Sequence, residues 1–179
     1  VSVGELERAI VAGVEPQKII FEGIGKTKQD ITFAIEKNIR LINIESIDEL
    51  ERVNEVALNQ NKKINIGIRL NPNIDSQTLD KISTGKKTDK FGIDTNKLDN
   101  IFEVLEASKK VNLIGLSCHI GSQIFNIDVF SDIFQKMKNN AQIFIDKGYN
   151  IKHVDLGGGL GVKYKNDEKK LNLELIKKE

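Results

Sequence analysis

Short apolar segments alternate with longer amphipathic segments along this 179-residue chain. The apolar segments are rich in isoleucine, leucine and valine, which is typical of buried strands in a parallel sheet. They predict five strands, at residues 18–21, 41–45, 64–70, 112–119 and 153–156. The amphipathic segments predict helices at about residues 2–12, 27–38, 46–61, 95–110, 129–147 and from about 168 onward. Strands that alternate with helices in this way indicate right-handed βαβ units and an α/β fold with a parallel sheet.

Four of the predicted strands carry a polar residue near their carboxyl end. These residues are Glu45, Arg69, His119 and Asp155, and the apolar residues that alternate with them can pack outward under helices. A (β/α)8 TIM barrel builds its active site from such side chains at the carboxyl rim of its strands. The pattern therefore predicts a partial (β/α)8 TIM barrel, with a doubly wound sheet as the structural alternative.

The number of strands and the ends of the chain suggest that this barrel is incomplete. Five predicted strands cannot close an eight-stranded barrel, and the chain begins at Val1 rather than at a methionine. We therefore expect a piece of a longer protein. The segment from Asp75 to Gly92 is predicted to be a long loop, and loops of this length in a compact domain are usually functional.

Two motifs near the predicted rim suggest a site for an anion. His119 ends its strand and Ser122 follows three residues later, while Gly157, Gly158, Gly159 and Gly161 follow the last strand. A turn so rich in glycine exposes backbone N–H groups to a ligand that must approach closely, most often a phosphate. His119 alone would more often be structural, but its position at a strand end favours a role in the site.

Neither common nucleotide fingerprint is complete. Gly25-Lys26-Thr27 resembles the end of a P-loop, but Ile20 stands where that motif needs its first glycine. Gly157 and Gly159 resemble the first pair of a dinucleotide fingerprint, but Val162 stands where its third glycine should be. The glycine turn is therefore interpreted as a cradle for a single phosphate. Glu45, Arg69 and Asp155 could equally form a charged network inside the barrel.

The remaining polar and reactive residues have simpler interpretations. Cys118 is predicted to be a core residue, and His153 is predicted to precede its strand at the surface. Four lysines near the rim are interpreted as solvated loop charges: Lys26, Lys86, Lys87 and Lys90.

Composition narrows the class of protein further. The net charge of +1 gives no reason to expect a nucleic-acid or membrane partner, and a single cysteine excludes an internal disulfide. With 39% hydrophobic and 30% charged residues, the chain is expected to be a reduced cytoplasmic protein.

Seven motifs occur in the order and at the spacing typical of one enzyme family. They are Ser2-x-Gly4-Glu5-Leu6, Gly25-Lys26-Thr27, Asn43-x-Glu45-Ser46, Arg69-x-Asn71-Pro72, Lys90-Phe91-Gly92-Ile93, His119-Ile120-Gly121-Ser122-Gln123 and Asp155-Leu156-Gly157-Gly158-Gly159-Leu160-Gly161. Over residues 1–162 the chain resembles the middle of a diaminopimelate decarboxylase, a barrel-type pyridoxal-phosphate enzyme similar in fold to ornithine decarboxylase and alanine racemase. Val3 stands where that family usually has glycine, at a turn remote from the chemistry.

The resemblance implies a cofactor, pyridoxal 5′-phosphate, and a role for each site residue. His119 would be the catalytic residue and would pack on the face of the cofactor ring. Ser122 and the glycine turn Gly157, Gly158 and Gly159, chiefly Gly159, would bind the phosphate. Asp155, Glu45 and Arg69 would support the ring and its neighbours. The loop from Ser83 to Lys90 would border the entrance for an amino-acid substrate.

The resemblance also implies parts that lie outside this chain. The family's cofactor-linked lysine would lie on a first barrel strand before Val1, and further cofactor and substrate residues and a C-terminal β domain would follow Glu179. The whole protein would be a homodimer with shared active sites that converts meso-2,6-diaminopimelate to L-lysine and CO2. The chain alone is expected to be inactive and poorly stable. The alternatives are a sister decarboxylase acting on ornithine, arginine or carboxynorspermidine, and a non-catalytic homologue that binds pyridoxal phosphate or phosphate.

Overall fold

The computed structural model describes residues 1–72 and 91–164 as alternating helices and strands. The α-helices are α1 (Val3–Val11), α2 (Lys28–Glu36), α3 (Ile47–Asn59), α4 (Leu98–Ala107) and α5 (Asp128–Asp146), and short 3-10 helices occupy η1 (Pro16–Lys18) and η2 (Thr95–Lys97). The strands are β1 (Ile20–Phe21), β2 (Leu41–Ile44), β3 (Ile64–Asn71), β4 (Ile93–Asp94), β5 (Val111–Ser117) and β6 (His153–Asp155).

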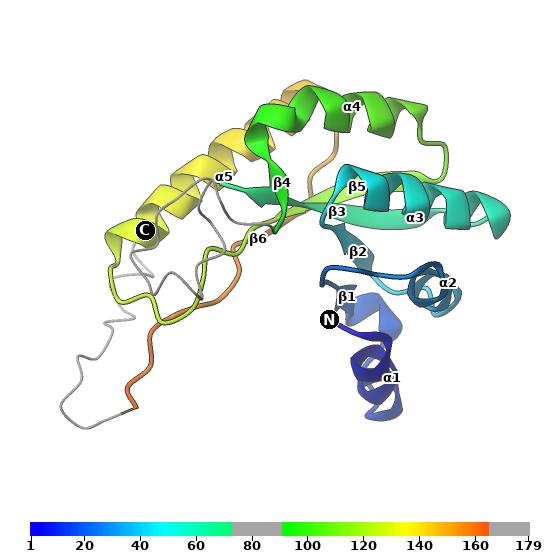
Figure 1. Ribbon diagram of the computed structural model, residues 1–179, viewed down its shortest axis with the longest axis horizontal. Coiled ribbons are helices and arrows are strands. Elements are labelled where there is room, and N and C mark those ends of the chain that lie inside the picture. Colours follow the sequence, from blue (N-terminus) through cyan, green and yellow to red (C-terminus); the bar gives the residue numbers. More distant parts are fainter. Residues whose placement is uncertain (73–90, 165–179) are drawn as a thin grey trace.

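The strands form a parallel sheet that curls into half of a barrel. Their order is β1-β2-β3-β5-β6, so most strands pair with the next strand along the chain, and β4 adds to the carboxyl end of β3. Figure 1 shows α2, α3, α4 and α5 arranged around one side of the curved sheet. The predicted partial barrel is therefore confirmed, and the doubly wound alternative, which needs helices on both faces, is wrong.

The hydrophobic core lies between the outer face of the sheet and these helices. Strand residues that alternate with the polar rim residues are fully buried there, including Ile42, Ile44, Ile66, Ile68 and Leu116. The helices contribute their apolar faces through Ile31, Leu50, Val53, Ile101 and Phe144. The outward packing predicted from strand alternation is thus confirmed.

Two glycines on the inner face allow the sheet to curve tightly. A Cβ atom on Gly67 of β3 would overlap the side chain of Asn43, and one on Gly115 of β5 would touch both Leu41 and His153 at 3.5 Å. Side chains of β2 and β6 therefore cross over the two central strands. At the amino end of the half-barrel, Arg40 reaches His153, with 2.9 Å between Nη2 and Nε2.

Three predictions about the elements need correction. β5 ends at Ser117, so His119 lies beyond the strand, and the short strand β4, which the sequence pattern does not predict, directly follows the predicted loop. His153 is a half-buried strand residue bonded to Arg40, not a surface residue before its strand. The predicted helix from about residue 168 and most of the predicted loop lie outside the described residues. No helix among the described residues is both long and apolar enough to cross a membrane.

Candidate active site

Two turns pack against each other at the carboxyl rim of β5 and β6. The first contains Gly121 and Ser122, and the second contains Gly159, whose backbone is left-handed with a φ of 87°. A Cβ atom at Gly159 would overlap the carbonyl oxygen of Gly121. The amide of Ile124 donates to the Gly159 carbonyl at 2.8 Å, which holds the turns together. The exposed hydroxyl-bearing residue Ser122 therefore lies beside the glycine turn, as predicted.

His119 borders the same turn. A Cβ atom at Gly157 would lie 2.8 Å from its Nδ1, so only glycine allows the turn to approach this closely. Burial lowers the pKa of the His119 imidazole from its usual value, and the Arg69 guanidinium lowers it further while Asp155 opposes the shift. His119 therefore presents a neutral, half-buried ring at pH 7.

The glycine turn has the donors that a phosphate requires. Asp155 fixes its first residue, because the Gly157 amide donates to Oδ1 of Asp155 at 2.7 Å. Gly158 is exposed, and no acceptor among residues 1–72 and 91–164 takes up the amides of Gly158 and Gly159. Free backbone N–H groups in a left-handed turn form an anion site. With a hydroxyl and a flat imidazole beside it, this donor set fits the phosphate and ring of pyridoxal phosphate.

A charged pair lies at the same rim. Arg69 donates through Nη1 to both carboxylate oxygens of Glu45, at 2.9 and 3.0 Å. The strand register places Arg69, Ser117 and Asp155 side by side on β3, β5 and β6. The Phe91 ring lies 5.7 Å from the Arg69 guanidinium. The predicted convergence of the strand-end residues is confirmed, and the charged network considered as an alternative exists within it.

Sequence reasoning missed two residues that face this rim. Glu22 follows β1 directly, as Glu45 follows β2, and this repeated position was the available signal. Burial raises the pKa of the Glu22 carboxyl, a hydrogen bond from Asn43 opposes the shift, and Asp155 adds to it. Ser117 is buried, and its hydroxyl has no hydrogen-bond partner in the described part of the chain.

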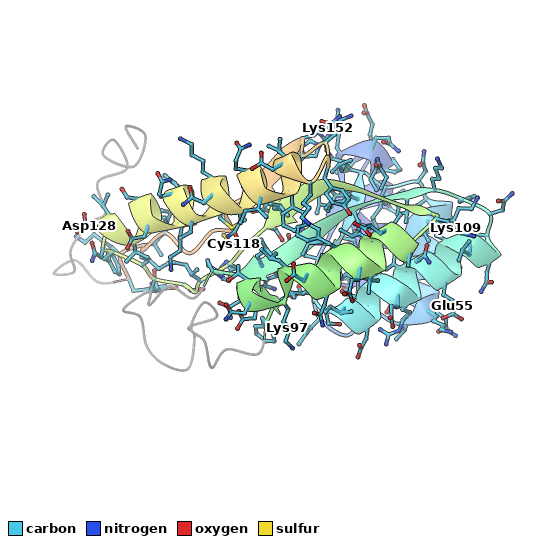
Figure 2. All side chains as sticks on the ribbon, turned by 90° about the horizontal axis from the view of Figure 1, so that it is seen from above. Glu55, Lys97, Lys109, Cys118, Asp128 and Lys152 are labelled. Atoms are coloured by element: carbon cyan, nitrogen blue, oxygen red, sulfur yellow. The ribbon has the colours of Figure 1, made fainter. Side chains whose placement is uncertain are left out.

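The interpretation of Lys26 as a solvated loop charge is wrong. Its side chain is only 1% exposed and its ammonium pairs with Glu49, which is also buried. Lys86, Lys87 and Lys90 lie outside the described residues. Cys118 is a core residue, as predicted, and burial raises the pKa of its thiol to about 12, which makes it a poor nucleophile. Figure 2 shows Cys118 in the interior, whereas Glu55 on α3 and Lys109 in the connection after α4 lie at the outside.

The rim also has space for a small molecule. A cleft of about 610 Å³ opens beside Glu45, between the start of α3 and the segment from β4 to α4. Polar residues dominate its lining, among them Ser46, Asp48, Asn71 and Asp94. A volume in this range is typical of sites for metabolites.

Comparison with known proteins identifies a family. The family of the pyridoxal-dependent decarboxylases, through its pyridoxal binding domain, matches residues 1–179. The diaminopimelate decarboxylase of Aquifex aeolicus is 39% identical over 169 residues, which are 94% of this chain and 40% of that protein. The chain thus spans about 40% of the length of the curated relatives it matches.

Solved structures agree with the sequence comparison. The diaminopimelate decarboxylase of Helicobacter pylori complexed with L-lysine matches with a TM-score of 0.89 and 38% identity, over 96% of this chain and 44% of that one. That of M. jannaschii with L-lysine matches with a TM-score of 0.84 and 41% identity, over 94% and 39%. An arginine decarboxylase of Paramecium bursaria Chlorella virus, with a TM-score of 0.76 and 24% identity over 99% and 45%, shares the fold.

The family match covers every residue, and the half-barrel, the glycine turn and the neighbouring imidazole fit the cofactor that the family binds. The chain belongs to the pyridoxal-dependent decarboxylases, matches their pyridoxal-binding domain, and is similar to the diaminopimelate decarboxylases.

Proposed function

We propose that this domain binds pyridoxal phosphate through the two packed turns and His119. Ser122 and the amides of Gly158 and Gly159 would hold the phosphate, with Gly157 shaping the turn. His119 would lie against the ring, and the Glu45–Arg69 pair and Asp155 would support it. The support for this proposal is that separate strand ends bring these groups to one rim, with backbone donors still available there.

In this proposal the cofactor supplies the reactive chemistry, and the residues of the chain hold and orient it. Bound pyridoxal phosphate supplies an electron sink for the electron pair that remains when CO2 departs from an amino acid. A neutral His119 can cover an aromatic ring without placing a positive charge on it, and the burial that lowers its pKa keeps it neutral. Arg69 is neutralised by Glu45, and Phe91 covers its guanidinium, so this cation is fixed in orientation.

We further propose that the whole protein converts meso-2,6-diaminopimelate to L-lysine and CO2. The observation that carries this proposal is the identity of 37–41% to the solved diaminopimelate decarboxylases of Helicobacter pylori and M. jannaschii. The arginine decarboxylase shares only 24% identity and informs the fold alone. In this proposal, the whole protein adds the cofactor-linked lysine, the other substrate residues and a C-terminal β domain, and forms a homodimer with shared sites.

A substrate panel tests this proposal. The full-length protein, loaded with pyridoxal phosphate, is given diaminopimelate, ornithine, arginine and carboxynorspermidine in turn, and CO2 release is measured. We expect kcat/KM for diaminopimelate to exceed the others by at least 100-fold. A preference for another diamino acid would contradict the substrate and leave the reaction class in place.

The same protein tests the non-catalytic alternative. Borohydride treatment followed by mass spectrometry shows whether the cofactor is linked to a lysine. A protein that binds pyridoxal phosphate without such a link and releases no CO2 from any substrate would be a binding homologue. Light scattering of the full-length protein would report whether it is a dimer.

A further inference from the structure

Lys26 lies in the connection from β1 to α2, and its ammonium is fully enclosed by acceptors. It donates to the carbonyl of Gly23 at 2.6 Å and to that of Asn43 at 2.7 Å. Its third partner is the Glu49 carboxylate, whose oxygens lie 3.2 and 3.3 Å away. The two side chains are 1% and 4% exposed. A buried ion pair of this kind is costly to desolvate, so its presence calls for a reason beyond stability.

The pair extends the hydrogen bonding of β2 beyond the end of its neighbour. β1 pairs with β2 only as far as Phe21 opposite Ile42. Past this point, the carbonyl of Asn43 accepts from Lys26, and the amide of Glu45 donates to Oε2 of Glu49 at 2.7 Å. The Lys26 ammonium therefore takes the place of a backbone N–H of a neighbouring strand, and the Glu49 carboxylate takes the place of a backbone carbonyl.

Glu49 reaches one residue further back than a capping box would require. Ser46 caps α3 and accepts from the Glu49 amide at 3.2 Å. In a capping box the Glu49 carboxylate would return to the Ser46 amide. Here it contacts the Glu45 amide instead, while Lys26 holds it from the other side. The Glu49 side chain thus fixes the backbone of the residue that pairs with Arg69.

We propose that Lys26 and Glu49 are positioning residues for the cofactor site, acting through Glu45 on Arg69. This inference rests on the proposed function of the domain. Neither residue needs to touch the cofactor, because Lys26 holds Glu49, Glu49 holds the Glu45 amide, and Glu45 orients the Arg69 guanidinium. Displacements of about 1 Å in such support are enough to lower the rate of an enzyme by orders of magnitude.

Two double variants of the full-length protein separate positioning from charge burial. Lys26→Met with Glu49→Gln removes both charges but keeps a side-chain oxygen that can accept from the Glu45 amide. Lys26→Met with Glu49→Met also removes both charges and loses that acceptor. The exposed pair of Lys28 on α2 and Glu55 on α3, 2.5 Å apart, supplies the control Lys28→Met with Glu55→Met.

Affinity for pyridoxal phosphate, kcat, KM and thermal midpoint are measured for each variant. We call the variant Lys26→Met with Glu49→Met the Met/Met variant. We expect it to bind the cofactor at least tenfold more weakly and to lose at least tenfold in kcat with little change in KM. The variant Lys26→Met with Glu49→Gln should lose less than Lys26→Met with Glu49→Met, because the glutamine keeps the acceptor for the Glu45 amide but lacks Lys26 to hold it. The control should stay within threefold of the wild type. Equal cofactor affinity and equal kcat in the two Lys26 double variants, whether both are normal or both are impaired, would overturn the inference.

Two further measurements keep the test decisive. If the Met/Met variant fails to fold, Glu49→Asp replaces it. The aspartate keeps the charge but is too short to reach both Lys26 and the Glu45 amide, so cofactor affinity should fall at least threefold. Unchanged affinity would refute the inference. If the wild type binds no pyridoxal phosphate, the proposed function fails, but a crystal structure of Met/Met still decides. Loss of the 2.9 Å contact between Arg69 and Glu45 would support positioning, and its retention would contradict it.

Discussion

Gly159 and Gly13 have nearly the same left-handed backbone, with φ angles of 87° and 89°. They differ in their surroundings, because a Cβ atom at Gly159 would overlap the Gly121 carbonyl whereas one at Gly13 meets nothing within 4 Å. We expect Gly13→Ala to cost about 1 kcal/mol in free energy of unfolding through backbone strain alone. Gly159→Ala should cost more and should weaken binding of pyridoxal phosphate at least tenfold. Urea denaturation of the full-length protein measures the free energy of unfolding, and titration measures its affinity for the cofactor. Equal effects of Gly13→Ala and Gly159→Ala would show that the turns at Gly121 and Gly159 need not touch.

The histidines give the stability of the domain a pH dependence. Burial lowers the pKa of His153 below its usual value near 6.5, and Arg40 and Lys152 lower it further. A lowered pKa means that the folded state binds fewer protons than the unfolded state. The contribution of His153 is therefore complete above about pH 6.5 and is lost as the pH falls through the folded-state pKa. Thermal midpoints between pH 7.5 and 5 should decline less in His153→Gln than in the wild type; parallel curves would contradict this.

At the scale of single residues, sequence reasoning found the strand-end groups but misjudged one lysine. Glu45, Arg69, His119 and Asp155 were predictable because the carboxyl ends of parallel strands must meet at one rim. Lys26 was not, because a lysine in a loop is solvated unless acceptors enclose it. Its acceptors come from three separate segments, and no local pattern in the sequence shows that they converge.

The helices α1 and α2 begin with the same capping box but differ in how much they pack. Thr27 accepts from the Asp30 amide while Asp30 accepts from the Thr27 amide, and Ser2 and Glu5 repeat this arrangement in α1. α2 buries Ile31, Ala34 and Ile35, whereas α1 buries Leu6 alone. We expect Thr27→Ala to lower the free energy of unfolding by about 1 kcal/mol.

Ser2→Ala should lower it less, because α1 can fray without global unfolding. Chemical denaturation measures both changes, and hydrogen exchange in α1 would detect the local loss that global unfolding does not report. A larger global effect from Ser2→Ala would show that α1 belongs to the cooperative core.

At the scale of elements, the types of structure were more predictable than their ends. Hydrophobic periodicity located five strands, of which β2, β3 and β5 each carry several buried aliphatic residues. It missed β4, since Ile93 and Asp94 are too few to show a period. It also extended the fourth predicted strand to His119, although β5 ends at Ser117. Beyond Ser117 the chain turns toward the glycine turn of β6, and that contact is tertiary, so it leaves no periodic signal.

For the whole molecule, the half-barrel follows from the repeated βα rhythm, but its curvature depends on particular glycines. Gly67 and Gly115 remove side chains where Asn43 and Leu41 cross the inner face. Their role could not be inferred from the sequence, because a glycine within a strand is equally consistent with a bulge or a close ligand. The same curvature brings β2 and β6 close enough for Arg40 to reach His153.

The outer edge of β6 leaves an apolar groove on the described surface. Val154 is 44% exposed, and with Leu156 it faces α5 residues that include Phe134, Met137 and Ile145 across a groove of about 360 Å³. Among the described strands, only β5 pairs with β6. An exposed apolar edge strand is a common route to self-association. We expect the 179-residue chain to associate at micromolar concentrations through this edge.

Val154→Lys should reduce this association because a lysine on an edge strand opposes pairing with another strand. Val11→Lys is the matched control, since Val11 is 88% exposed on α1, away from the groove. Sedimentation velocity over a range of concentrations would measure the effect. Equal association of both variants would place the contact elsewhere. A selective loss with Val154→Lys would show that this edge requires a cover, as expected if the remaining strands and helices of a complete barrel pack there in the whole protein.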